Sequence, residues 1–179
     1  MEATLVVLND LVNQGIIERY AIGGAVGAIF WVEPFDTIDL DVFVFLPASA
    51  PPLDPLRNVF SHLKNSGYEF DGEFLMVEGI PVQFLPAEDT KGLSKAALEA
   101  AVQVTYRGVD LEISTWVFTP EYLIAIALNV KRSKDYDRVS RLLSEAPVNR
   151  EVVEELITRF GLKESWEVFI RRYPECAQH

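Results

Sequence analysis

The sequence predicts a mixed α+β fold, in which a mixed sheet with interleaved helices is followed by a helical C-terminal third. Two observations predict it: strand-like and helical patterns alternate up to about residue 118, and every later pattern is helical. The length of 179 residues and the hydrophobic content of 49% suit one packed core. We therefore expect a mixed-sheet core at residues 1–118 and a helical subdomain at residues 119–179.

The N-terminal elements follow from apolar spacing. Leucine and valine recur at helical spacing over residues 3–18, which predicts the first helix. Residues 20–22 form a short apolar run that ends at Gly23-Gly24, and this predicts a strand, a tight turn and a short helix. The most strongly apolar run, residues 37–46, predicts the central strand of the sheet.

The later elements are bounded by glycine and proline. Apolar runs on either side of Gly79 and of Gly108 predict two hairpins, and Pro120 suits the first position of a helix. The strands are expected at residues 74–77, 81–85, 102–107 and 109–114, and the helices at residues 54–66, 93–101, 120–130, 133–143, 149–160 and 162–172.

The charge balance limits the classes of partner. The chain has 16 Lys and Arg against 27 Asp and Glu, a formal net charge of −11. Such a chain is not expected to bind nucleic acid non-specifically, because that binding needs basic residues on the contact surface. The apolar runs are too short to span a bilayer, and the N-terminus lacks the pattern of a secretory signal. We expect a cytoplasmic protein without membrane contact.

The choice of metal is narrowed by composition. With two histidines and one cysteine, Cys176, a His/Cys zinc site is not expected. A bound metal would be held by carboxylate oxygens, which favours Mg²⁺ or Mn²⁺.

Two aspartates on one predicted strand are the strongest functional signal. In residues 37–46, Asp39 and Asp41 share one strand face with Phe43, while the other face is apolar. Two neighbouring acids on a covered strand repel each other, and a divalent cation would relieve that repulsion. The alternative is that both acids lie at the exposed start of the strand. The Gly23-Gly24 turn favours the first interpretation, because glycine leaves backbone N–H groups open to a phosphate.

The chain resembles the nucleotidyltransferase superfamily related to DNA polymerase beta, particularly small bacterial members similar to minimal nucleotidyltransferases and abortive-infection-type toxins. Ile22-Gly23-Gly24 followed by Asp39-Leu40-Asp41 carries the resemblance. A second similarity is the helical segment at residues 120–128 with the following Lys131-Arg132-Ser133-Lys134-Asp135. The resemblance implies the nucleotidyltransferase fold with a helical C-terminal part.

The resemblance also implies a role for each matching residue. Gly23 and Gly24 would contact a nucleoside triphosphate, and Asp39 and Asp41 would bind Mg²⁺. In the helical motif, Lys131, Lys134 and Asp135 would face the active cleft.

Active members of the superfamily carry a third carboxylate on a following strand, as general base for the attacking hydroxyl. This chain has Gln83 there, and glutamine cannot accept that proton at neutral pH. Glu112, on another predicted strand, could substitute if it faces the cleft; otherwise it is an exposed strand carboxylate.

Two functions are therefore expected. The first is Mg²⁺-dependent transfer of a nucleoside monophosphate from a triphosphate to a hydroxyl acceptor, which could be a small molecule, a protein or an RNA end. The alternative is a catalytically impaired module of the same fold that binds nucleotide or a partner. The resemblance to toxins adds a cognate antitoxin protein as a candidate partner.

Overall fold

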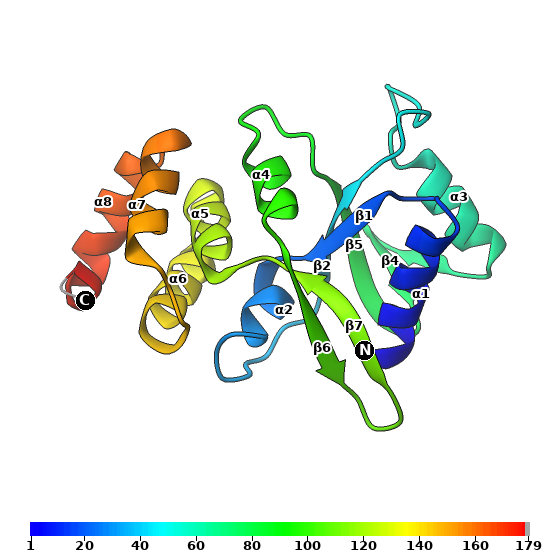
Figure 1. Cartoon of the computed structure of the whole chain (residues 1–179), viewed down its shortest axis with the longest axis horizontal. Helices are drawn as coiled ribbons and strands as arrows, with labels where there is room; N and C mark the ends of the chain where they lie inside the picture. Colours follow the sequence, from blue (N-terminus) through cyan, green and yellow to red (C-terminus); the bar gives the residue numbers. More distant parts are fainter. Residues whose placement is uncertain (178–179) are drawn as a thin grey trace.

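A seven-stranded mixed sheet runs through the centre of the computed structural model, which describes residues 1–177 (Figure 1). The strands lie in the order β3-β4-β5-β2-β1-β7-β6. Their bounds are β1 Arg19–Ile22, β2 Leu40–Phe45, β3 Glu69–Asp71, β4 Phe74–Val77, β5 Ile80–Pro86, β6 Val102–Arg107 and β7 Glu112–Val117. The helices are α1 Glu2–Asn13, α2 Gly24–Ile29, α3 Arg57–Asn65, α4 Leu93–Glu99, α5 Pro120–Val130, α6 Ser133–Glu145, α7 Arg150–Arg159 and α8 Lys163–Arg172, with a short 3₁₀ turn at Pro174–Ala177. The mixed α+β class is confirmed.

Helices cover both faces of the sheet. One core cluster joins α1 and α3 to the face that carries Leu40 and Val42, and the other joins α4 and α5–α8 to the face that carries Phe43. Helix α2 contributes Val26 to the first cluster and Ala28 to the second. In Figure 1, α5–α8 stack at one end of the molecule and α1 and α3 lie at the other.

Strand β2 is central, as predicted. It pairs antiparallel with β1 and parallel with β5, and Leu40, Val42, Phe43 and Val44 are buried. Because side chains alternate along a strand, Asp41 points to the same side as Phe43, toward the C-terminal helices. The pattern of the sequence thus places this acid between the sheet and the helical third.

The start of β2 corrects the sequence prediction. The strand was expected from residue 37 and begins at Leu40, so Asp39 lies in the preceding loop and Ile38 is 83% exposed. The parallel register pairs Leu40 with Val82, and one residue earlier on β5 is Pro81, which has no N–H to donate. Strand β2 therefore begins at Leu40, because Pro81 cannot donate the preceding hydrogen bond of the ladder.

The helical third shares its core with the sheet. Phe118 directly follows β7, and the centre of its ring lies 4.8 Å from the centre of the Phe43 ring on β2. The indole N–H of Trp31, which follows α2, donates to the Phe118 carbonyl at 2.9 Å. The division of the chain at residue 118 stays a prediction, because one continuous apolar cluster contains residues from both sides of it.

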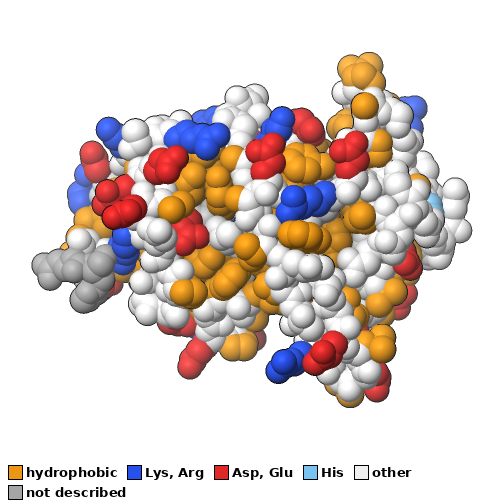
Figure 2. Space-filling model, in the orientation of Figure 1, with side chains coloured by type: hydrophobic (Ala, Val, Ile, Leu, Met, Phe, Trp, Pro, Cys, Tyr) orange, Lys and Arg blue, Asp and Glu red, His pale blue; other side chains and the backbone are white. Residues whose placement is uncertain are grey.

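The described part of the chain shows charges of both signs on the face in view (Figure 2) and has no helix that could span a membrane. On the face shown in Figure 2, lysine and arginine side chains are scattered among acidic and apolar ones. Within residues 1–177, no helix is both long and apolar enough to cross a bilayer.

Candidate functional site

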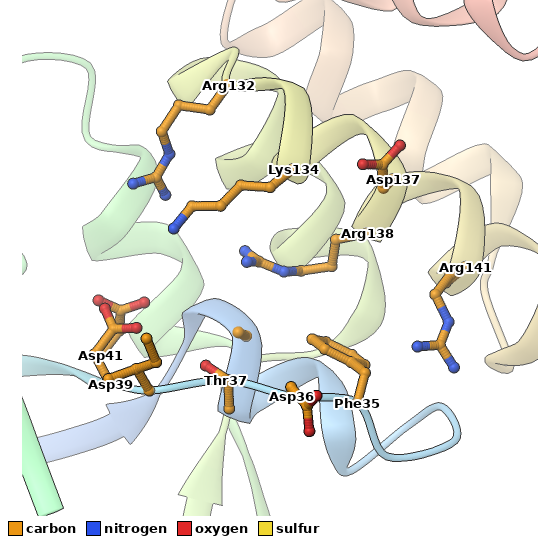
Figure 3. Close-up of a pocket in the computed structure, with 12 residues that line it drawn as sticks. Phe35, Asp36, Thr37, Asp39, Asp41, Arg132, Lys134, Asp137, Arg138 and Arg141 are labelled. Carbon is orange, nitrogen blue, oxygen red and sulfur yellow. The ribbon is translucent and has the colours of Figure 1, made fainter.

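Asp39 and Asp41 lie side by side at the start of β2, where two cavities meet (Figure 3). We name the first the cation-lined cavity; it measures about 410 Å³, and its basic lining residues are Arg132, Lys134, Arg138 and Arg141. We name the second the apolar cavity; it measures about 210 Å³, and its apolar lining residues are Phe43, Leu85, Leu123, Ile126, Ala127 and Val130. Both cavities are lined by the two aspartates together with Arg132 and Arg138.

The glycine pair packs closely against β2. The Gly23 N–H donates to the Asp41 carbonyl at 3.0 Å, which fixes the turn beside the strand. Gly24 has a φ of +57°, and a Cβ placed on it would overlap the Asp41 carboxylate. A Cβ on Gly23 would lie 2.6 Å from the Phe43 ring. Both positions therefore require glycine, and at Gly24 the requirement comes from the aspartate itself.

Helix α6 supplies the positive side of the site. Lys134, Arg138 and Arg141 recur at spacings of four and three residues, so they share one helix face. Figure 3 shows the ends of Arg132, Lys134 and Arg138 directed across the cavity toward Asp39 and Asp41. Positive charge facing a carboxylate pair is suited to a ligand that carries both a divalent cation and phosphate groups.

Asp135 is a buried carboxylate that positions two arginines. Its side chain is 1% exposed. Arg132 donates to it through Nε at 2.9 Å and Nη2 at 3.3 Å, and through its backbone N–H at 3.2 Å. The Nη1 atom of Arg138 lies 3.5 Å from the same carboxylate. Asp135 therefore acts on the site through Arg132 and Arg138, because its own oxygens are occupied by them.

The loop that leads to Asp39 is held by α6. The guanidinium of Arg141 lies 4.9 Å from the centre of the Phe35 ring and donates to the Glu33 carbonyl at 3.0 Å. The Glu33 N–H donates to the Glu145 carboxylate at 3.0 Å. These contacts hold residues 33–35 against α6 and so fix the position of the loop that leads to Asp39.

The electrostatic state of Asp41 reflects its surroundings. Burial, followed by the negative charge of Asp39, raises the pKa of Asp41 above its ordinary value. The positive charges of Arg138, Arg132 and Lys134 act in the opposite direction. Burial lowers the pKa of Arg138, which an arginine tolerates without losing its charge near neutral pH.

The other predicted site residues differ in position. Gln83 lines the apolar cavity and pairs in register with Asp41 across β2 and β5. Lys131 lies 4.0 Å from the Glu164 carboxylate and lines neither cavity. Glu112 is exposed, pairs with Arg107 at 3.3 Å, and stands at the start of β7, whereas the end of β7 lies beside Ile22. Glu112 is therefore remote from Asp41 and does not face the cleft.

The residues present fit a magnesium ion. The pair Asp39 and Asp41 offers hard oxygen donors, and Mg²⁺ is commonly held by one or two carboxylates together with substrate phosphates. Residues 1–177 contain no cluster of three or more His, Cys, Asp or Glu that could hold a metal without a substrate. A cation at the pair would also offset the repulsion that raises the pKa of Asp41.

The fold matches solved nucleotidyltransferase structures. An antigenic nucleotidyltransferase-like protein from Paracoccidioides brasiliensis aligns with a TM-score of 0.66 and 12% identity, over 98% of this chain and 91% of that one. The antibiotic-resistance factor ANT(2'')-Ia aligns with a TM-score of 0.51 and 12% identity, over 97% of each chain. The chain has the nucleotidyltransferase fold. Neither the protein-family models nor the curated proteins give a match to the sequence.

Sequence reasoning did not assign the two arginines that line both cavities. The side chain of Arg138 is 12% exposed and lines both cavities with Arg132. The signal that could have found Arg138 is its spacing of four residues from Lys134 on a helix that follows the Asp pair in the chain.

We expect Gly24→Ala to be more destabilising than Gly72→Ala. Both glycines have φ near +60°, but a Cβ on Gly72 meets nothing within 4 Å. The backbone conformation alone should cost about 1–2 kcal/mol in each variant. The overlap with Asp41 should add about 1–3 kcal/mol in Gly24→Ala. Urea denaturation measures both free energies of unfolding, and equal losses would show that Gly24 does not pack against the carboxylate.

We expect Asp41→Asn to stabilise the metal-free protein near neutral pH. Because the pKa of Asp41 is raised on folding, the ionised side chain lowers the free energy of unfolding there. As the pH falls through the folded pKa, the native protein binds this proton and recovers stability, fully so below the unfolded value near 3.8. The gain in Asp41→Asn should therefore shrink toward that pH.

Urea titrations of Asp41→Asn and of the exposed control Asp54→Asn, in the presence of a chelator, test this. The control should stay within about 0.5 kcal/mol of the native protein. A loss of stability in Asp41→Asn at neutral pH would contradict the electrostatic account.

Proposed function

We propose that this chain is a Mg²⁺-dependent nucleotidyltransferase that moves a nucleoside monophosphate from a nucleoside triphosphate to a hydroxyl acceptor. The observation that carries the proposal is the opposition of Asp39 and Asp41 to the basic face of α6 across one cavity. The similarity in fold to nucleotidyltransferase structures supports the same class of reaction. The triphosphate would bind in the cation-lined cavity.

Each residue has a separable task in this proposal. Asp39 and Asp41 would hold Mg²⁺, and Gly24 leaves room for the Asp41 carboxylate. Lys134 and Arg138 would hold and orient the phosphate oxygens, because charged donors bind phosphate strongly. When bound, the cation would supply neutralisation of the charge that develops on the transferred group. Asp135 keeps two of the basic residues in place, as the hydrogen bonds of Arg132 and the ion pair of Arg138 show.

A second candidate function is nucleotide binding without turnover. It is favoured by Gln83, which stands beside Asp41 where the resemblance leads us to expect a third carboxylate. A glutamine amide can orient a hydroxyl group but cannot remove its proton. A cognate antitoxin partner also stays a prediction.

One experiment separates these functions. Titration calorimetry with Mg²⁺ and each of the four nucleoside triphosphates should give saturable binding under both. Only the enzyme should transfer radiolabelled nucleotide to itself, to RNA or to components of a lysate. Asp41→Ala should lower that transfer by at least about a hundredfold, because a directly acting electrostatic group is removed.

Asp54→Ala, at an exposed position that lines neither cavity, should transfer at the native rate. Binding without transfer would favour the second function. If no triphosphate binds in the presence of Mg²⁺, both functions are wrong.

A further inference from the structure

The apolar cavity adjoins the cation-lined cavity at the aspartate pair and has its own lining on the sheet and α5. Its walls come from Phe43 and Leu85 on the sheet and from residues of α5, of which Leu123 is buried and Val130 is 45% exposed at the rim. Gln83 supplies a neutral polar group inside it. The cavity thus combines apolar walls and one amide with charged groups, namely the aspartate pair, Arg132, Asp135 and Arg138.

Reaction geometry assigns a role to this cavity, on the condition that the proposed function is correct. In phosphoryl transfer the attacking and leaving oxygens lie roughly in line with the phosphorus atom. If the leaving phosphates occupy the cation-lined cavity, the attacking hydroxyl needs a separate approach to Asp39 and Asp41. The apolar cavity is a second space that the same two aspartates line.

The size and charge of the cavity restrict the acceptor. A dry cavity of about 150 Å³ can hold benzene, so the volume of about 210 Å³ suits one substituted ring. Asp135 is already occupied by two arginines, and Arg132 and Arg138 themselves line the space. A cationic acceptor would therefore meet positive charge and apolar walls, while the aspartate pair is committed to Mg²⁺.

Because Gln83 stands where a general base is expected, the acceptor needs a hydroxyl group that ionises readily. Because the amide cannot take a proton, the hydroxyl group must ionise without a base on β5. An alkyl hydroxyl is about as weak an acid as water and ionises too rarely. A phenol, with a pKa of about 10, does so far more readily, and the neighbouring arginines favour its anion.

We infer that the acceptor of this transferase is a small, uncharged phenol that binds with its ring in the apolar cavity. The phenolic oxygen forms a bond to the α-phosphorus, and the bond from that phosphorus to the bridging oxygen of the β-phosphate breaks. The electron pair leaves with pyrophosphate, and the phenolic proton passes to water. Gln83 orients the phenolic oxygen and stays unchanged.

Binding can be tested without metal or turnover. Fluorine NMR should show saturable binding of para-fluorophenol to the metal-free protein and little binding of para-fluorobenzylamine. Val130→Trp, which fills the rim of the cavity, should weaken phenol binding at least tenfold. Val168→Trp, at a position 37% exposed on α8 and outside the cavity, is the matched control and should bind as the native protein does.

The NMR titration also tests the position of the acceptor relative to the nucleotide. A non-hydrolysable triphosphate analogue with Mg²⁺ should leave phenol bound. Displacement of the phenol by the analogue would overturn the inference, because the cavity would then hold part of the nucleotide. Absence of phenol binding in the native protein, or equal binding of the amine, would overturn it as well.

Turnover gives a second, independent readout. The native protein should transfer labelled nucleotide to para-fluorophenol at least a hundredfold faster than to cyclohexanol. Gln83→Glu should raise the rate with cyclohexanol more than the rate with the phenol, because it introduces a base that the phenol does not need. Triphosphate binding is measured in the same samples. If the triphosphate binds but transfer to the two acceptors is equal or absent, the phenol acceptor is refuted and the proposed nucleotide site is not. If the triphosphate does not bind, the proposed function is refuted.

Discussion

The Asp41 carboxylate lies against the backbone of Gly24, and the geometry of the site depends on this contact. The central position of β2 brings the acid beside the turn after β1, where only a residue without a side chain fits. Because side chains alternate along β2, Val42 is buried under α1 and α3, whereas Asp41 points toward α5 and α6. Sheet order and side-chain alternation therefore bring the acids to the base of a cleft roofed by the helical third.

Local charge explains how a chain with a net charge of −11 can offer a site for a polyanion. Helix α6 concentrates positive charge on one face, and the buried Asp135 holds Arg132 and Arg138 by hydrogen bonds and ion pairing. Burial of Asp135 is tolerated because its oxygens are paired with these groups. The acidic surface elsewhere does not oppose binding strongly, since exposed charges are screened beyond about 8–10 Å in physiological salt.

The sequence predicted the elements whose ends are set by local chemistry. The predicted bounds of β4, β6 and α5 match the structure, and each has a glycine or proline within two residues of at least one end. The strand predicted at residues 109–114 is observed at Glu112–Val117, so Gly108 did not set its start. The predicted start of β2 at residue 37 was wrong, because the observed start at Leu40 depends on Pro81, which lies far away in the sequence. Asp39, Asp41 and Gln83 line one cavity, and their proximity is what the resemblance to nucleotidyltransferases implied. The role of Arg138 depends on the packing of α6 against α5 and α2, which spacing alone does not show.

The central claim is that the aspartate pair holds a divalent cation beside a triphosphate. It is tested most directly by anomalous diffraction from crystals grown with Mn²⁺ and a non-hydrolysable nucleoside triphosphate. We expect an anomalous peak coordinated by Asp39 and Asp41, with phosphate oxygens directed toward Lys134 and Arg138. A triphosphate bound elsewhere, or bound with no Mn²⁺ peak at the aspartates, would contradict it.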